Sequence, residues 1–182
     1  QINYFEKRNG LSVAFAGSYQ GASQEFNENA VIGADFLWNW GKFSLDGETH
    51  QLIRTANASN NGKLNYFAYT GYLRSAFNII LNNGATLEPV LMWMYFKGPS
   101  DAMELLEASK LGSLQASESK WNFGANYYFN TNLKLSLFYT LRDGNSGDFA
   151  EQHVHNNYFG RTQDGLPYIS GDWIGLGMVV IL

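Results

Sequence analysis

Residues Trp121–Tyr139 read WNFGANYYFNTNLKLSLFY, and their hydrophobicity alternates from one residue to the next. Large apolar or aromatic residues occupy every second position before and after the central Asn130-Thr131-Asn132 segment. A period of two is typical of a β-strand with one apolar and one polar face, and asparagines between two such runs favour a tight turn. The stretch therefore predicts an antiparallel hairpin.

The same alternation recurs along the chain. It predicts eight strands, at residues 11–20, 30–41, 42–55, 64–74, 85–97, 120–130, 132–143 and 171–182. The links near Gly41 and Thr131 are minimal, whereas the links at 98–119 and 144–170 are long. Outer-membrane barrels have short turns at one end and long extracellular loops at the other. We therefore expect an all-β fold, an antiparallel up-and-down transmembrane β-barrel. Residues 1–182 would form one barrel domain or a C-terminal half-barrel, with both long links as extracellular loops.

The composition excludes several classes of protein. The 182 residues carry 12 Lys and Arg against 16 Asp and Glu, a net charge of -4, whereas nucleic-acid-binding proteins usually present a basic surface. The chain has no cysteine, which excludes disulfides, thiol catalysis and Cys-based zinc sites. It also lacks the run of about 18 apolar residues that a transmembrane helix needs. A membrane β-barrel is not excluded, because its strands need only about 9–11 residues of alternating character.

Alternation alone does not say which face meets water. A soluble lipocalin-like barrel turns its apolar face inward and would point Leu133, Leu135 and Leu137 into the barrel, whereas a membrane barrel turns that face toward lipid. The residues Gly177–Leu182 resemble the C-terminal recognition signal of bacterial outer-membrane proteins. Aromatic residues beside the tight turns also favour the membrane, because an interfacial aromatic girdle belongs there. The girdle candidates are Trp38, Trp40, Tyr127 and Phe129.

A second candidate hairpin, Gly33–Glu48, reads GADFLWNWGKFSLDGE and carries an acid on each side of a glycine turn. Together with Trp121–Tyr139, and more weakly with the Gly84–Phe96 strand that contains Glu88, it resembles the phosphate-selective porin O and P family. The resemblance implies an outer-membrane porin of a Gram-negative bacterium, usually a homotrimer, with no catalysis and no cofactor. It also implies a barrel of about 16 strands, of which the eight strands here would be the C-terminal half.

The polar faces of the predicted strands gather ionisable residues that are candidates to line a lumen. These are Lys42, Asp46, Glu48, His50, Arg54, Arg74, Glu88, Lys134 and Arg142. An anion filter needs stacked cations, and no arginine ladder appears in this mixed set, so these residues do not by themselves predict phosphate selectivity. Asp46 and Glu48 project side by side rather than across a cleft, which argues against a catalytic acid pair. His153 and His155 have no obvious third ligand, so no metal site is predicted.

We therefore hypothesise an outer-membrane porin that lets small polar or anionic solutes diffuse passively through a water-filled lumen. Its partners would be the lipid bilayer, the solutes and, in a homotrimer, further copies of the chain. One alternative is a non-conducting outer-membrane barrel that serves as a structural or docking subunit of a larger assembly. The other is a soluble lipocalin-like barrel that binds a ligand.

Overall fold

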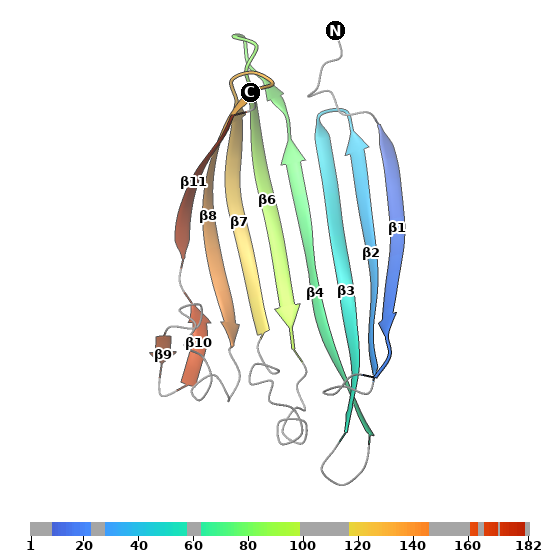
Figure 1. Cartoon of the computed structure of the whole chain (residues 1–182). Helices are drawn as coiled ribbons and strands as arrows, with labels where there is room; N and C mark the ends of the chain where they lie inside the picture. The colour runs from blue at the N-terminus through green and yellow to red at the C-terminus, as the bar shows by residue number, and fades with distance from the viewer. Residues whose placement is uncertain are drawn as a thin grey trace.

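The computed structural model describes residues 9–22, 28–57, 63–98, 117–145, 161–163, 166–170 and 172–180, and the regular structure there is entirely β (Figure 1). None of the described segments is an apolar helix of membrane-spanning length. The strands are β1 (Gly10–Gln20), β2 (Glu28–Trp40), β3 (Phe43–Asn57), β4 (Lys63–Phe77), β5 (Ile79–Ile80), β6 (Thr86–Lys97), β7 (Ser117–Tyr128), β8 (Leu133–Asn145), β9 (Arg161–Gln163), β10 (Leu166–Ser170) and β11 (Trp173–Val180).

All these strands belong to one 11-stranded antiparallel sheet. Strands β1, β2, β3, β4, β6, β7 and β8 lie in the sheet in the order of the sequence, and β11 pairs with β8 (Figure 1). The short β5 pairs with β6, while β10 joins β9 to the loop end of β8. The predicted all-β, antiparallel, up-and-down arrangement is confirmed. Within the described residues β1 and β11 do not pair with each other, so the sheet is open there.

The eight predicted strands correspond to the eight long strands of the sheet, with ends that differ by a few residues. β7 begins at Ser117, so the end of the expected loop 98–119 is already strand. β8 continues to Asn145, and the short strands β9 and β10 lie inside the expected loop 144–170. Residues 99–116, 146–160 and 164–165, which include His153 and His155, lie outside the described residues.

Two tight turns fix how neighbouring strands pair. Between β2 and β3, Gly41 has a φ of 55°, in the left-handed region that glycine enters without steric cost. Between β7 and β8, the side chain of Asn130 accepts hydrogen bonds from the amides of Asn132 and Leu133, at 2.8 and 3.0 Å. Asparagine commonly bonds the backbone ahead of it in this way. These short connections leave little freedom for the strands to slip past each other.

Side chains divide between two faces of the sheet, because successive residues alternate and directly paired residues share a face. We call "inner" the face that carries the paired residues Asp46 and Arg74, and "outer" the face that carries the paired residues Phe43 and Phe77. Among the described side chains of the strands, those that are polar and buried all belong to the inner face. They are Ser44, Asp46, Thr86, Glu88, Asn126, Ser136 and Thr140.

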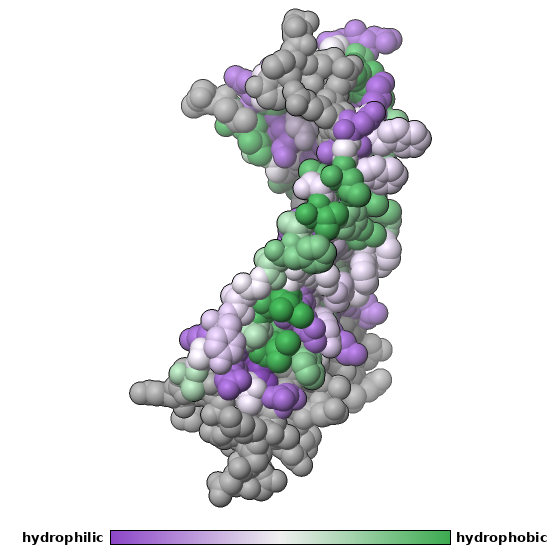
Figure 2. All heavy atoms as spheres, turned by 90° about the vertical axis from the view of Figure 1, so that its right-hand side faces the viewer, coloured by the Kyte–Doolittle hydropathy of each residue, from purple (hydrophilic) through white to green (hydrophobic). Residues whose placement is uncertain are grey.

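Large apolar side chains are exposed instead. Phe15 is 83% exposed and Leu137 54% exposed, and both lie on the outer face. The hydrophobic residues that are buried among the described ones are three alanines, at positions 68, 76 and 85. A soluble barrel would bury its leucines, so this distribution argues against the lipocalin alternative. In side view the sheet bends into a crescent, with apolar side chains gathered near its middle (Figure 2).

Glycines lie beneath aromatic rings from neighbouring strands. A Cβ on Gly124 would collide with the ring of Phe138 and would lie 2.8 Å from the backbone oxygen of Leu137. On the outer face, a Cβ on Gly71 would lie 2.8 Å from the ring of Tyr95. A glycine within a strand is otherwise unfavourable, and a cross-strand aromatic that covers it restores apolar contact. In each pair the absence of a glycine side chain leaves room for the aromatic ring.

We predict that Gly124→Ala destabilises the folded protein by about 1–3 kcal/mol, the usual cost of overpacking, because the added methyl displaces the ring of Phe138. Gly17→Ala is the matched control, since a Cβ there meets only the Val31 carbonyl oxygen at 3.7 Å. Urea unfolding of both variants in lipid vesicles measures the difference. Equal stabilities of the two variants would mean that the Gly124–Phe138 contact contributes nothing.

Candidate functional site

Charge is segregated between the two faces. Over residues 30–40, 43–53, 67–77, 87–95, 121–129 and 133–141, the outer positions hold no charged side chain. The inner face carries the ionisable residues Asp35, Asp46, Glu48, His50, Arg54, Arg74, Glu88, Glu118, Lys120, Lys134 and Arg142. The inner face is therefore the candidate functional surface.

Most of the lining candidates from the sequence lie on this inner face. Lys42 does not, because it is exposed in the turn between β2 and β3. Sequence reasoning missed Glu118 and Lys120, since we expected the strand to begin at residue 120 and the preceding residues to form a loop. The signal was present for Lys120, because Lys120 and Asn122 alternate with Trp121 and Phe123, whereas Ser117–Ser119 are polar at every position and do not indicate a strand.

Asp46 and Arg74 form a cross-strand ion pair between β3 and β4. The Nε of Arg74 donates to Oδ1 of Asp46 at 2.9 Å, and the two residues are direct partners in the register. Asp46 is only 7% exposed, so its carboxylate depends on this charge-assisted bond. The side chain of Arg74 is half exposed and borders a hollow of about 520 Å³ on the inner face. It thus neutralises a buried acid and still faces the hollow.

Glu88 anchors a polar network at the turn end of the inner face. Its carboxylate accepts hydrogen bonds from Nδ2 of Asn126 at 3.0 Å and from the hydroxyl of Tyr128 at 2.8 Å. Ser136 on β8 extends the network by donating to Oδ1 of Asn126 at 2.6 Å. The amine of Lys134 lies 5.9 Å from the centre of the Tyr128 ring, within cation–π range. The network joins β6, β7 and β8 through buried polar groups.

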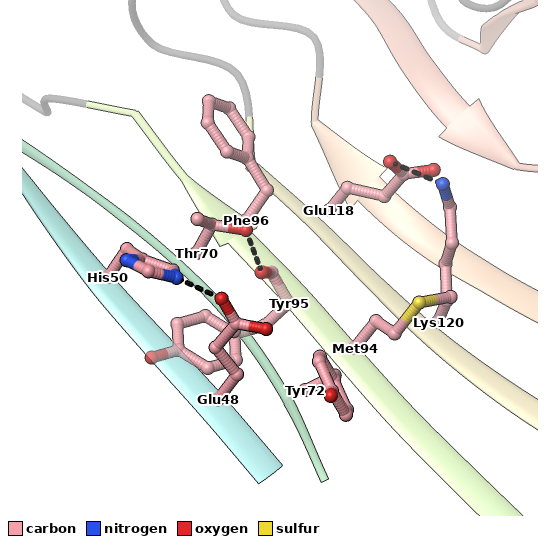
Figure 3. A pocket seen from close by; sticks show the side chains of 10 residues that line it. Glu48, His50, Thr70, Tyr72, Met94, Tyr95, Phe96, Glu118 and Lys120 are labelled. Atoms are coloured by element: carbon pink, nitrogen blue, oxygen red, sulfur yellow. Dashed lines mark hydrogen bonds and ion pairs between the residues drawn. The ribbon is translucent and has the colours of Figure 1, made fainter. Parts of the chain in front are cut away.

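A second hollow, of about 340 Å³, lies nearer the long loops and is bordered by charged residues from two sides (Figure 3). On β3, His50 and Glu48 are bonded through Nε2 and Oε1. On β7, the carboxylate of Glu118 bonds the amine of Lys120 at 3.0 Å and the guanidinium of Arg142 at 2.5 and 2.8 Å. The ionisable groups thus form local pairs and triads along the wall of the hollow.

These pairings differ from those of a catalytic centre. Asp46 and Glu48 bond different partners, Arg74 and His50, and Ser136 donates to an asparagine instead of a histidine. A nucleophilic serine needs a base within hydrogen-bond reach. Among the described residues, no group of three or more His, Cys, Asp or Glu side chains is arranged to hold a metal ion.

The comparison with protein families gave one match. The family model described as phosphate-selective porin O and P matches residues 17–160, which run from β1 to beyond β8. The chain belongs to this porin family. Comparisons with curated proteins and with solved structures gave no significant match. Membership indicates a porin of the Gram-negative outer membrane, and porins as a class are channels, not enzymes.

The outer face of this porin carries two groups of aromatic residues. At the turn end, Trp38 stacks on Trp40 with ring centres 6.4 Å apart, and Tyr127 and Phe129 form a T-shaped pair with ring centres 4.7 Å apart. Nearer the loops, the rings of Trp93 and Trp121 lie 6.2 Å apart. The sequence placed Trp121 on the apolar face of its strand but did not pair it with Trp93, because the residues 85–97 are apolar at nearly every position.

The separation of the two groups fits a lipid bilayer. Trp121 and Phe129 are eight residues apart in sequence, or about 26 Å at roughly 3.3 Å per residue along an extended strand. At a tilt of about 40° this corresponds to about 20 Å of height, close to the apolar band of roughly 25 Å that aromatic girdles flank in outer-membrane barrels.

We predict that Leu137→Arg lowers the free energy of unfolding in lipid vesicles by about 2–4 kcal/mol, the cost of an arginine near the bilayer midplane. Ala14→Arg serves as the control, because Ala14 pairs with Asp35 on the inner face and an arginine there meets water. Urea titration of both variants in vesicles checks the difference. If the two variants were equally stable, the outer face would not be in contact with lipid.

Proposed function

We propose that this protein is a passive diffusion porin for small polar solutes, anions included. The observation that carries the proposal is the confinement of charged side chains to the inner face across the whole apolar band. Hydrocarbon cannot solvate charge, whereas a water-filled lumen can. The outer face provides a low-dielectric surface toward lipid, and the inner face provides a polar surface toward water.

The proposal includes closure of the sheet into a barrel. The edges β1 and β11 present backbone N–H and C=O groups that find no partner strand among the described residues. In hydrocarbon each unpaired group costs several kcal/mol, so barrels close completely. A barrel of about 16 strands, to which these eight long strands contribute half, is wide enough for an aqueous channel, whereas eight strands alone leave an interior filled by side chains.

Solute movement through this lumen needs no chemical step. Paired charges along the inner wall keep water in the pore and focus the electric field without holding a solute tightly. Among the described residues of the inner face, acids and cations are equal in number, and the arginines at 54, 74 and 142 stand on three different strands. This lining supports weak charge preference and gives no support for a phosphate filter.

We also propose how the sheet is oriented in the outer membrane and which aromatic residues lie at its two interfaces. The turn-end group with Trp38, Trp40, Tyr127 and Phe129 would form the aromatic girdle at the periplasmic interface, and Trp93 and Trp121 would lie toward the outer interface. The stretches 98–119 and 144–170 would then contribute the extracellular loops. The same outer face is available for contacts with neighbouring copies in a homotrimer.

Conductance of the full-length native protein in planar bilayers tests the pore. We expect stable steps that rise in proportion to salt concentration, as diffusion through a water-filled lumen requires. A correctly folded, membrane-inserted protein that does not conduct would refute the porin proposal and favour the alternative of a structural or docking subunit.

Charge reversal at Lys134 tests the lining. Lys134 borders the 520 Å³ hollow, so Lys134→Glu should raise the ratio of cation to anion permeability by about two-fold at 0.1 M salt, allowing for screening over about 10 Å. Lys97→Glu makes the same charge change at an exposed outer position and should leave the ratio unchanged. The reversal potential in a salt gradient measures both. An equal response of the two variants would remove Lys134 from the lumen wall.

A further inference from the structure

Five directly paired residues border the 520 Å³ hollow in one row across the inner face. They are Arg74, Met92, Asn122, Thr140 and Trp173, one each from the strands β4, β6, β7, β8 and β11 (Figure 1). Three strand spacings of about 4.8 Å separate β4 from β8, or about 14 Å between backbones. The row is therefore long enough to contact a small solute through several side chains at once.

Hydrogen-bonding groups of both kinds stand along this row. Thr140 is 1% exposed and Asn122 is half-buried. Oγ1 of Thr140 and Oδ1 of Asn122 are buried, and neither has a hydrogen-bond partner among the described residues. On β4, the half-exposed guanidinium of Arg74 gives Nε to Asp46 and holds further N–H donors beside the hollow. A buried oxygen without a donor is costly, so a solute that supplies donors here is favoured.

Aromatic rings complete the wall of the hollow. The side chain of Trp173 is 51% exposed, and a Cβ on Gly175 would lie 2.7 Å from its ring. The ring of Phe138 lies over Gly124 in the same way and also borders the hollow. Because Trp173 shares a face with Thr140, it is not part of a girdle that contacts lipid. Its exposed ring is instead available to the apolar surface of a solute.

The formal charges around the hollow balance. Among the described residues that border it, the cations are Arg74 and Lys134, and the acid is Glu88. Asp46, bonded to Arg74, supplies the second negative charge. An anion would bring only acceptors and would leave Oδ1 of Asn122 without a donor, whereas a hydroxyl group both donates and accepts. The hollow therefore suits an uncharged solute that carries several hydroxyl groups and one apolar surface.

We propose that this row is a binding subsite for neutral sugars on the path through the pore. Hydroxyl groups of the sugar donate to Thr140 and Asn122 and accept from Arg74, while the C–H face of the sugar ring stacks on Trp173. The subsite rests on the proposed porin function, because solutes reach the inner face through the lumen, and it adds a class of solute to that function.

Saturation-transfer NMR of glucose with the full-length native protein, in a detergent without a sugar headgroup, tests the subsite. Sorbitol, the open-chain polyol with the same carbon skeleton, is the reference solute because it has no ring to stack. We expect tighter binding of glucose than of sorbitol. Thr140→Val and Trp173→Leu should each weaken glucose binding by about 2- to 10-fold, the range for loss of one hydrogen bond or one aromatic contact. Thr140→Val should fold normally, since valine replaces a hydroxyl that has no partner among the described residues.

Matched controls exist for both substitutions. Thr70→Val changes an inner-face threonine outside this hollow, and Trp121→Leu changes an outer-face tryptophan, so both should keep the native affinity for glucose. Equal affinities for glucose and sorbitol, or native affinity in both Thr140→Val and Trp173→Leu, would overturn the subsite. Binding is measured here without ion current, so failure of the pore shows separately, as absence of conductance in planar bilayers.

Discussion

Hydrocarbon cannot solvate a charge or satisfy a backbone hydrogen bond, and this constraint organises the whole sheet. It assigns ionisable residues to one face and large apolar residues to the other, so burial is inverted relative to a soluble protein. Thr86 and Thr140 are 1% exposed, while Phe15 is 83% exposed. The same constraint requires each buried inner acid to meet a donor on its own face. Asp46 meets Arg74 and Glu88 meets Asn126 and Tyr128 for this reason.

The sequence predicted the fold well because the constraint acts on every second residue. An alternation between lipid and water is visible in one strand without knowledge of its neighbours, so all eight long strands could be located. The faces could be assigned for six of them, but not clearly for 85–97, which is apolar at nearly every position, or for 171–182. β5, β9 and β10 were missed, since two to five residues are too few to display a period. The beginning of β7 was missed because its first residues, Ser117–Ser119, are polar on both faces.

The candidate site was only partly predictable, because it depends on which residues stand opposite each other. Period two places Glu48 and Lys120 on polar faces, but their place on opposite sides of the 340 Å³ hollow depends on the register of three successive pairings from β3 to β7. The contacts between glycines and aromatic rings also depend on the register and cannot be predicted from one strand alone. Nothing in the sequence near Gly124 indicates that Phe138 of the next strand covers it. Alternation within single strands therefore identifies which residues belong to the inner face but not which of them lie beside each other.

The register of the strands connects the tight turns to the charged side chains of the inner face. A slip by one residue moves every side chain of a strand to the opposite face, and a slip by two keeps the face but shifts each charge along the wall. If β3 slipped by two against β4, the partner of Arg74 would change from Asp46 to Ser44 or Glu48, and a buried acid would lose its donor. The ion pairs on the wall thus reinforce the register that the short turns at Gly41 and Asn130 impose.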